Sequence, residues 1–266
     1  NPGMCDVATT VNIGVNDFEK ISEFCLAENI DLVFVGPEVP LCNGIVDYLC
    51  ERNIRVFGPS KAAARLEGSK AFSKDMMAKY NIPTAKFASF NNYDEAKNYL
   101  ENVDYRVVLK ADGLAAGKGV VIPETKQEAL EALKEMMVDD CFNGAASSVV
   151  IEEFLEGEEF SLLAFVHNET VVGMQLAQDH KRAFDNDQGL NTGGMGAYTP
   201  VNHLPQSAYD DALEHIVKAM AKAMVKEGCP FTGILYGGCM LCKDGVKTIE
   251  YNVRFGDPET EVVLLA

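Results

Sequence analysis

The sequence contains no tryptophan, and no apolar run approaches the ~20 residues that a membrane-spanning helix needs. It is also poor in cations, because 23 lysines and arginines stand against 40 aspartates and glutamates, for a formal net charge of −17. Nucleic acid and anionic membranes repel a chain this acidic, so we expect neither as a partner. If such a protein handles an anionic ligand, it has to gather its few cations locally.

Paired cysteine motifs are also not prominent in the sequence. Its eight cysteines are scattered through expected helices and strands, and Cys50, Cys141, Cys229 and Cys242 do not have the spacing of metal ligands. This pattern predicts reduced thiols rather than a disulfide framework. The first residues, NPGMCDVATT, lack the charged and apolar regions of a signal peptide. We therefore expect a cytoplasmic protein.

The chain has 266 residues, 47% of them hydrophobic, which is enough for roughly one to two folded domains. Near its start, the apolar run Asp31–Gly36 predicts a buried parallel strand, Cys42–Arg52 has helical apolar spacing, and Arg55–Phe57 predicts a second strand. This order indicates a doubly wound parallel α/β domain, in which ligands bind at the carboxyl ends of the strands. Glu38 lies at such an end, and an ordinary loop residue is the alternative to a ligand there.

The rest of the chain predicts helices separated by antiparallel strands. Helices are expected over Ser69–Tyr80, from Thr125 to about Val138, with Thr125 and Glu128 as a capping box, and from Ser207 to Gly228. Strands are expected over Val107–Lys110, Val120–Ile122, Ser147–Phe154, Phe160–Val166, Thr170–Ala177, Gly233–Cys242 and Val246–Val253. The change of pattern near Asn53–Pro59 places a domain border between residues 1–59 and residues 60–266.

The segment Thr248–Thr260, TIEYNVRFGDPET, holds the most chemistry in the fewest residues. Side chains alternate along a strand, so Glu250, Asn252 and Arg254 share one face. A carboxylate beside an amide oxygen suits a Mg²⁺ ion that substrate phosphates also hold, and the arginine can contact a transferring phosphoryl group or a carboxylate. The following turn, 256–259, adds two carboxylates. The alternative is an edge strand whose polar face meets solvent.

A glycine-rich segment, DGLAAGKG at residues 112–119, lies between two expected strands. It is not a P-loop, because three residues separate its first two glycines where a P-loop has four, and glycine follows the lysine. A small lysine-bearing loop can still fold over a nucleotide, with backbone N–H groups, Lys118 and the neighbouring Lys110 facing phosphate oxygens. An ordinary glycine-rich hairpin is the alternative.

Three further segments suggest ligand contacts. Val150–Leu155 predicts a strand that runs into an acidic linker, where backbone groups can pair with adenine and Glu159 with ribose hydroxyls; a solvated acidic edge is the alternative. Gln178–Arg182 (QDHKR) groups an acid with three potential cations, and Asn191–Tyr198 (NTGGMGAY) has the backbone freedom to approach a ligand closely. Both have poor propensity for regular structure. We expect them to form a substrate site, although His180 alone also fits an ordinary turn.

The order of these segments closely resembles the glycinamide ribonucleotide synthetases (phosphoribosylamine–glycine ligases), ATP-grasp enzymes of purine biosynthesis. The resemblance rests on SKAFSKDMMAKYNIPTA, VLKADGLAAGKGVVI, VIEEFLEGEE, QDHKR, NTGGMGAYTP, FTGILYGG and IEYNVRFGDPET. The E-x-N-x-R strand is shared by ATP-grasp enzymes such as biotin carboxylase, whereas QDHKR with NTGGMGAY looks like this family in particular. Two positions depart from it: Leu190 stands where proline is usual, and Glu261 where glutamine is frequent.

The resemblance implies a role for each segment. Contacts to ATP phosphates would come from Lys70, Lys110, Gly113, Gly117, Lys118 and Gly119. Contacts to adenine and ribose would come from Glu152, Glu153, Phe154, Leu155 and Glu159. The metal, Mg²⁺ or Mn²⁺, would be held by Glu250 and Asn252. Substrate contacts would come from Glu38, Asp179, His180, Lys181, Arg182, Asn191, Thr192, Gly193, Gly194, Asp257 and Glu259. The catalytic charges would be those of Arg254 and Lys118.

The fold implied is α/β: a truncated N-terminal doubly wound domain (1–59), then an ATP-grasp domain of linker helices and two antiparallel sheets (60–266). The family's first strand and its small C-terminal domain are expected to be absent from this chain. The reaction implied starts with attack of the glycine carboxylate on the γ-phosphate of the co-substrate MgATP. The amine of 5-phosphoribosylamine then attacks the resulting glycyl phosphate. Two alternatives remain open: another ATP-grasp carboxylate–amine ligase, and a nucleotide-binding fragment without catalysis. The oligomeric state is not indicated.

Overall fold

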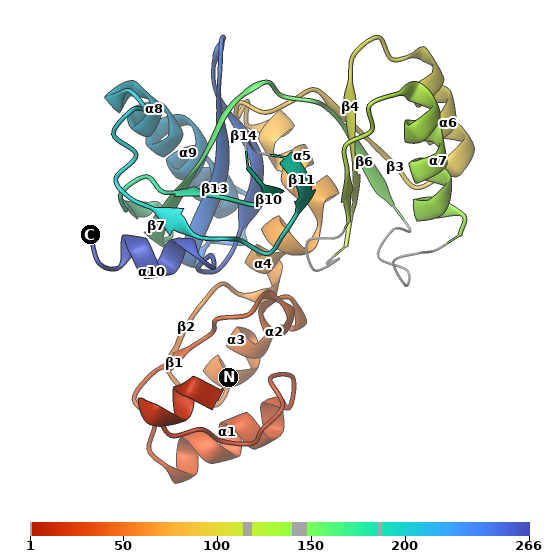
Figure 1. Ribbon diagram of the computed structural model, residues 1–266. Helices are drawn as coiled ribbons and strands as arrows, with labels where there is room; N and C mark the ends of the chain where they lie inside the picture. Colours follow the sequence, from red (N-terminus) through yellow and green to blue (C-terminus); the bar gives the residue numbers. More distant parts are fainter. Residues whose placement is uncertain (1, 114–118, 140–147, 186–187) are drawn as a thin grey trace.

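The computed structural model describes residues 2–113, 119–139, 148–185 and 188–266. Figure 1 shows an N-terminal lobe, drawn in red and orange, below two antiparallel sheets that lie beside each other. The smaller sheet carries helices α6 and α7 on its outer side, and the larger sheet carries α8 and α9 (Figure 1). None of the helices in the described ranges is long and apolar enough to cross a bilayer.

The N-terminal lobe consists of a short 3-10 helix, three α-helices and two strands. In chain order they are η1 (Pro2–Asp6), α1 (Phe18–Ala27), β1 (Val33–Phe34), α2 (Glu38–Asn43), α3 (Ile45–Cys50) and β2 (Val56–Phe57). The predicted parallel pairing is confirmed, since Val33 lies opposite Val56. The predicted burial is wrong, because β1 spans two residues and Phe34 is 48% exposed. The single helix predicted over Cys42–Arg52 is wrong: Gly44, with φ of 94°, ends α2 and begins α3. Glycine adopts this left-handed conformation without the steric penalty of a side chain.

Two helices connect the lobe to the sheets, α4 (Lys61–Gly68) and α5 (Lys70–Lys79). Each begins at a serine N-cap: the Ser60 hydroxyl accepts from the Ala63 N–H, and the Ser69 hydroxyl from the Phe72 N–H. Such caps satisfy backbone donors that have no partner inside the helix. The predicted helix from Ser69 is confirmed, whereas α4 was not predicted. Side chains of both helices, such as Glu67 of α4 and Lys70 of α5, line the cavity described below.

The smaller sheet has the strand order β3-β6-β4-β5, with every neighbouring pair antiparallel. Its strands are β3 (Phe87–Phe90), β4 (Val107–Ala111), β5 (Val120–Val121) and β6 (Val149–Glu153), and its helices are α6 (Tyr93–Asn102) and α7 (Lys126–Met137). Leu109 and Ile151 pack against Leu100 and Leu133 in a core of their own. The Thr125 cap of α7 is confirmed by its hydroxyl, which accepts from the Glu128 N–H.

The larger sheet has the order β14-β13-β7-β8 and is also antiparallel. Its strands are β7 (Gly157–His167), β8 (Thr170–Gly173), β13 (Thr232–Cys242) and β14 (Gly245–Asn252). Its helical layer is α8 (Gln206–Asp211), the π-helical turn η2 (Ala212–Val217) and α9 (Lys218–Lys226). The predicted strand Thr170–Ala177 is too long, because β8 ends at Gly173 and Ala177 makes an isolated bridge to Ser161.

One cysteine pair departs from the expected scatter. Cys239 and Cys242 have a C-x-x-C spacing on β13. Residues three apart on a strand point to opposite faces, so the two thiols do not face one ligand together. Burial raises the pKa of the Cys239 thiol, and Cys239 is fully buried. The pair therefore consists of packed thiols rather than a metal or redox centre.

The segments QDHKR and NTGGMGAY form short paired strands, although poor regular structure was predicted for both. The first pair is β9 (Gln178–Asp179) with β12 (Ala197–Tyr198), and the second is β10 (Arg182–Phe184) with β11 (Gln188–Asn191). Asp179 lies opposite Ala197, and Arg182 lies opposite Asn191. Pairing with a distant strand thus outweighs the weak local propensity and joins the two segments. The last helix, α10 (Glu259–Val263), follows β14.

Candidate functional site

A cavity of about 440 Å³ lies between the two sheets. The smaller sheet contributes Val108, Lys110 and Val120 to its lining, and the larger sheet contributes Met240 and Glu250. Helices α4 and α5 line it as well. The larger sheet also contacts the segment that leads into β3, because the Thr248 N–H of β14 donates to Pro83 O at 2.8 Å. The site is therefore built from segments that lie far apart in the sequence.

Most of the site residues named from the sequence line this cavity. They are Glu38, Lys70, Lys110, Gly119, Glu152, Glu153, Phe154, Leu155, Glu159, Asp179, Lys181, Thr192, Gly193, Glu250, Asn252, Arg254, Asp257 and Glu259. Gly113, His180 and Gly194 are not part of the lining, and the His180 ring stacks on Tyr198 instead. Gly117 and Lys118 lie outside the described residues, and for Arg182 and Asn191 only the backbone is described.

A buried Lys–Glu–Lys network lies on the floor of the cavity. Glu152 of β6 is only 3% exposed; one carboxylate oxygen lies 2.8 Å from Lys74 Nζ, and the other lies 3.0 Å from Lys110 Nζ. Burial raises the pKa of Glu152, but the two ammonium groups outweigh it and hold that pKa below its usual value. Its carboxylate is therefore ionised and engaged by the lysines, although the sequence assigned it to adenine.

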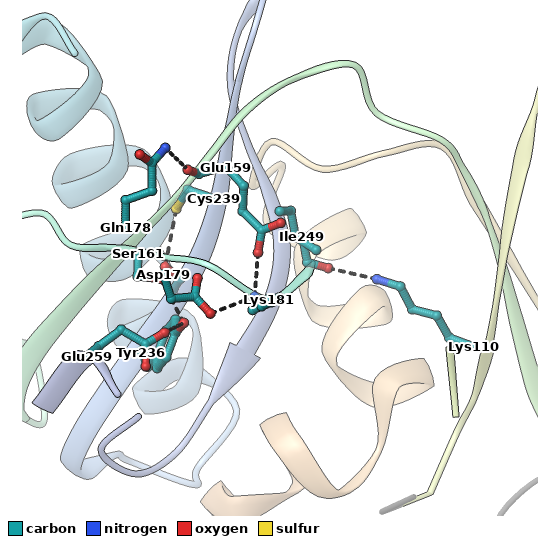
Figure 2. Close-up of polar contacts among 11 residues, drawn as sticks. Lys110, Glu159, Ser161, Gln178, Asp179, Lys181, Tyr236, Cys239, Ile249 and Glu259 are labelled. Carbon is teal, nitrogen blue, oxygen red and sulfur yellow. Dashed lines mark hydrogen bonds and ion pairs between the residues drawn. The ribbon is translucent and has the colours of Figure 1, made fainter. Parts of the chain in front are cut away.

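The same network connects the smaller sheet to β14. Lys74 Nζ donates to Thr84 Oγ1 at 2.7 Å, and the Thr84 hydroxyl donates to Thr248 O at 2.8 Å. Lys110 Nζ donates to Ile249 O at 3.2 Å (Figure 2). Burial lowers the pKa of Lys110, but Glu152 and Glu250 outweigh this and raise it. Lys110 thus remains a cation at the edge between the two sheets.

Glu250 and Asn252 of β14 both line the cavity, as the alternation of the strand predicts. Burial raises the pKa of Glu250, but Lys110, Lys181 and Lys70 outweigh it and hold that pKa below its usual value. An ionised carboxylate beside an amide oxygen is a donor set that fits a hard divalent cation. Among the described residues, no group of three or more His, Cys, Asp or Glu side chains surrounds one point. A metal ion held here would therefore need oxygen ligands from a substrate as well.

The wall formed by β7, β9 and β13 carries two polar groupings, which Figure 2 shows. In the first, Lys181 Nζ lies 2.5 Å from Glu159 Oε1 and 3.6 Å from Asp179 Oδ2. Burial lowers the pKa of Lys181, but these two carboxylates outweigh it and raise it. In the second, the Tyr236 hydroxyl lies 2.7 Å from Ser161 Oγ and donates to the Glu259 carboxylate. Both groupings fix charged side chains at the cavity wall.

Arg254 follows the end of β14 and is held by two carboxylates. Its Nη2 lies 3.0 Å from Glu67 Oε1, and its Nε lies 3.4 Å from Glu38 Oε2. The Val253 N–H donates to Glu67 Oε2 at 2.7 Å. Burial raises the pKa of Glu67 to about 7, against the opposing effect of Arg254. The guanidinium thus lies at the junction of the N-terminal lobe and the larger sheet.

In the segment predicted to contact adenine, two backbone N–H groups already form hydrogen bonds within the protein. The Glu153 N–H donates to Lys86 O and the Phe154 N–H to Arg106 O, each at 2.8 Å. A bound base therefore meets neither of these N–H groups. Apolar side chains also line the cavity, including those of Ile122, Leu155 and Met240. Apolar walls from both sheets suit a planar ring.

Five polar residues of the cavity were not among the predicted site residues: Glu67, Ser73, Lys74, Tyr236 and Tyr251. A signal existed for Lys74, because it lies four residues after Lys70 on a predicted helix and so shares its face. Glu67 and Tyr236 have no comparable signal. Their partners, Arg254 and Glu259, lie far away in the sequence, so only the folded chain brings each pair together.

Two family models match the chain. The model of the phosphoribosylglycinamide synthetase N domain matches residues 1–67, and that of the ATP-grasp (A) domain of the same enzyme matches residues 68–260. The phosphoribosylamine–glycine ligases of Halalkalibacterium halodurans and Streptococcus pyogenes are 56% and 52% identical to this chain, each over 99% of it. The matches cover 62% and 63% of those relatives, so the chain spans less than two thirds of their length.

Solved structures show the same architecture. The crystal structure of phosphoribosylamine–glycine ligase from Thermotoga maritima has a TM-score of 0.84 and 37% identity, and the match covers 100% of this chain and 64% of that one. A biotin carboxylase from Campylobacter jejuni has a TM-score of 0.72 at 18% identity, over 92% of this chain and 53% of that one. The second likeness shows the fold alone.

Proposed function

Because the chain belongs to the phosphoribosylglycinamide synthetase family, we propose that it forms the ATP-binding part of a ligase that joins glycine to 5-phosphoribosylamine. The products are glycinamide ribonucleotide, ADP and phosphate. The observation that carries the proposal is the gathering of cations in one cavity of a chain with net charge −17. Lys70, Lys110 and Lys181 there surround the ionised Glu250. Such clustering in an acidic protein suits a polyanionic ligand.

We propose one orientation for ATP in the cavity. The base would lie between apolar side chains such as Ile122, which follows β5, and Met240 of β13, and the phosphates would extend toward Lys70 and Lys110. Glu159 lines the same cavity and is the proposed contact to ribose. We propose that Gly113, Gly117, Lys118 and Gly119 contact the ATP phosphates. Fixed positive groups next to the phosphates stabilise the charge that shifts during phosphoryl transfer.

Glu250 and Asn252 would hold the divalent cation, Mg²⁺ or Mn²⁺. When bound, this cation neutralises negative charge on the phosphate oxygens of ATP. Lys110, Lys181 and Lys70 hold Glu250 ionised before any ligand arrives, so its carboxylate is ready to accept a cation without losing a proton. Asn252, the next residue on the same face of β14, adds a neutral oxygen.

The chemistry proceeds in two displacements. A glycine carboxylate oxygen attacks the γ-phosphorus, and the bond to the β-phosphate oxygen breaks, which gives glycyl phosphate and ADP. The 5-phosphoribosylamine nitrogen then attacks the glycyl carbonyl carbon; the C–O bond to phosphate breaks, and the amine loses a proton. Arg254 and Lys181 would neutralise the substrate oxygens, and Glu38 would face the amine. Neither step needs a protein nucleophile, so positioning and charge stabilisation carry the rate.

The proposal also covers the domain organisation of the chain and its location in the cell. We propose that residues 1–59 belong to the N-terminal α/β domain and residues 60–266 to the ATP-grasp domain; the two family models meet at 67/68, near the end of α4. The seven cysteines in the described part of the chain are free thiols, which supports a cytoplasmic location.

The test is an ADP-release assay on the natural full-length polypeptide, with glycine and 5-phosphoribosylamine each omitted in turn. We expect release to require glycine, and Glu250→Ala to lower the rate by roughly 10²–10³-fold, as loss of one electrostatic partner typically does. Glu135→Ala, on the exposed face of α7, is the matched control and retains the rate. Near-normal turnover of Glu250→Ala contradicts the assignment. ADP release that depends on a different acid or amine indicates another ligase, and ATP binding without release indicates a nucleotide-binding protein without catalysis.

A further inference from the structure

Glu67 occupies the last turn of α4 and uses both oxygens of its carboxylate on consecutive residues of the site. Oε2 accepts from the Val253 N–H at 2.7 Å, and Oε1 lies 3.0 Å from Arg254 Nη2. The Glu67 side chain is 8% exposed. Such a carboxylate fixes both the backbone where β14 ends and the guanidinium that follows it. It is a buried acidic side chain that has no role in the two displacements proposed above.

The second carboxylate on Arg254 binds it less firmly. Glu38 Oε2 lies 3.4 Å from Arg254 Nε, and the Glu38 side chain is 29% exposed. Arg254 Nε is nevertheless buried and makes no hydrogen bond within the described part of the structure. The contact to Glu38 is thus a loose ion pair at the cavity, whereas the contact to Glu67 is close and buried. The two glutamates therefore differ in how easily a ligand replaces them.

We propose that Glu67 is a positioning residue that anchors the Arg254 guanidinium at the phosphate end of the cavity while Glu38 is left for the substrate. The inference rests on the proposed function and deepens it, because it divides one three-residue cluster into an anchor, a charge that acts on the substrate, and an exchangeable partner. With Glu67 in place, Arg254 keeps its position when the incoming amine takes over Glu38.

The surroundings of Glu67 agree with this division. Arg254 and Glu250 face it from the end of β14, and Glu38 and Cys42 face it from α2. Burial raises the pKa of Glu67 to about 7, so its carboxylate is charged above neutral pH. In the Glu67→Gln variant the amide oxygen still accepts from the Val253 N–H, but the neutral side chain no longer attracts the guanidinium. The substitution therefore separates anchoring of the backbone from anchoring of Arg254.

The experiment is a double-mutant cycle on the natural full-length polypeptide, with Glu67→Gln, Arg254→Lys and the double variant. Glycine-dependent ADP release gives kcat and KM, thermal unfolding gives stability, and Glu135→Gln is the matched control. We expect Glu67→Gln to lower kcat by about tenfold without lowering the unfolding temperature, and to change kcat less than about twofold when residue 254 is already lysine. Equal losses in both backgrounds, or a loss that follows the unfolding temperature, overturn the proposal.

A binding measurement tests the role of Glu67 independently of the proposed ligase activity. Affinities for ADP and for a non-hydrolysable ATP analogue are measured on the same four proteins. We expect Glu67→Gln to weaken binding of the analogue several-fold more than binding of ADP, and only when Arg254 is present, because the proposed mechanism places the γ-phosphate near Arg254. If the wild-type protein releases no ADP with glycine, the proposed function fails, and the affinity cycle alone decides the role of Glu67. Equal weakening of both nucleotides overturns it.

Discussion

Replacing Lys74 by methionine removes the most deeply buried cation of the cavity floor. The side chain is 2% exposed, and its ammonium group contacts Glu152 and Thr84. Burial lowers the pKa of Lys74 to about 8, compared with 10.5 for an ordinary lysine, against the opposing effect of Glu152. Methionine has a similar length and no charge, so the substitution removes the titration while filling most of the volume.

The size and sign of the effect follow from linkage. Between pH 8 and 10.5 the unfolded chain holds a proton on Lys74 that the folded chain has lost, so the free energy of unfolding rises with pH across this window. One pKa unit corresponds to about 1.4 kcal/mol, so the full effect is about 3 kcal/mol. Below pH 8 Lys74 is protonated in both the folded and the unfolded state, so it does not make the free energy of unfolding depend on pH.

The assay is urea unfolding of wild type and Lys74→Met at pH 7.5, 9 and 10.5. Other groups titrate in both proteins, so the difference between their free energies of unfolding isolates Lys74. We expect the wild type to gain about 3 kcal/mol relative to the variant from the lowest to the highest pH. Lys97→Met, on the exposed surface of α6, is the control and shows no such divergence. If the difference between the free energies of unfolding of wild type and Lys74→Met stays constant across this pH range, Lys74 has an ordinary pKa and the reasoning is refuted.

Two further predictions concern stability. Glu67→Gln should gain up to about 3 kcal/mol in free energy of unfolding relative to wild type as pH rises from 4.5 to 7, because folded wild type retains a proton on Glu67 there. Urea unfolding at pH 4.5 and 8 checks this, and a constant difference contradicts it. Gly157→Ala should cost about 1–3 kcal/mol, because its new Cβ would lie 2.3 Å from Leu241 O. Gly14→Ala, with nothing within 4 Å, is the control, and equal urea midpoints for the two variants would refute the clash.

Sequence reasoning succeeded where one local pattern determines the answer. The alternation of a strand puts Glu250 and Asn252 on one face, and both line the cavity. The spacing of apolar residues after Ser207 predicted α9, and the capping box of Thr125 and Glu128 predicted the start of α7. These features depend on neighbours within a few positions, so a single sequence contains the information.

It failed where a distant part of the chain decides the structure. Gln178–Arg182 has weak strand propensity, yet its residues pair with others near Asn191 and Ala197. Glu152 follows the pattern of an acidic edge, but the fold places two lysines against it. The sequence around Glu67 gave no indication of its partner, because Arg254 lies nearly two hundred positions later in the chain. In each case the deciding contact forms between elements rather than within one.

The buried network also explains how a nucleotide site can keep a carboxylate on its floor. Glu152 alone would cancel the charge of Lys110, which lies 3.0 Å away, and would repel phosphates. Lys74 pairs with the other carboxylate oxygen at 2.8 Å, so the three side chains together keep one net positive charge. This net positive charge is available at Lys110, whose ammonium group also donates to Ile249 O of β14. Glu152 therefore holds Lys110 in place, and Lys74 preserves the positive charge that a phosphate meets there.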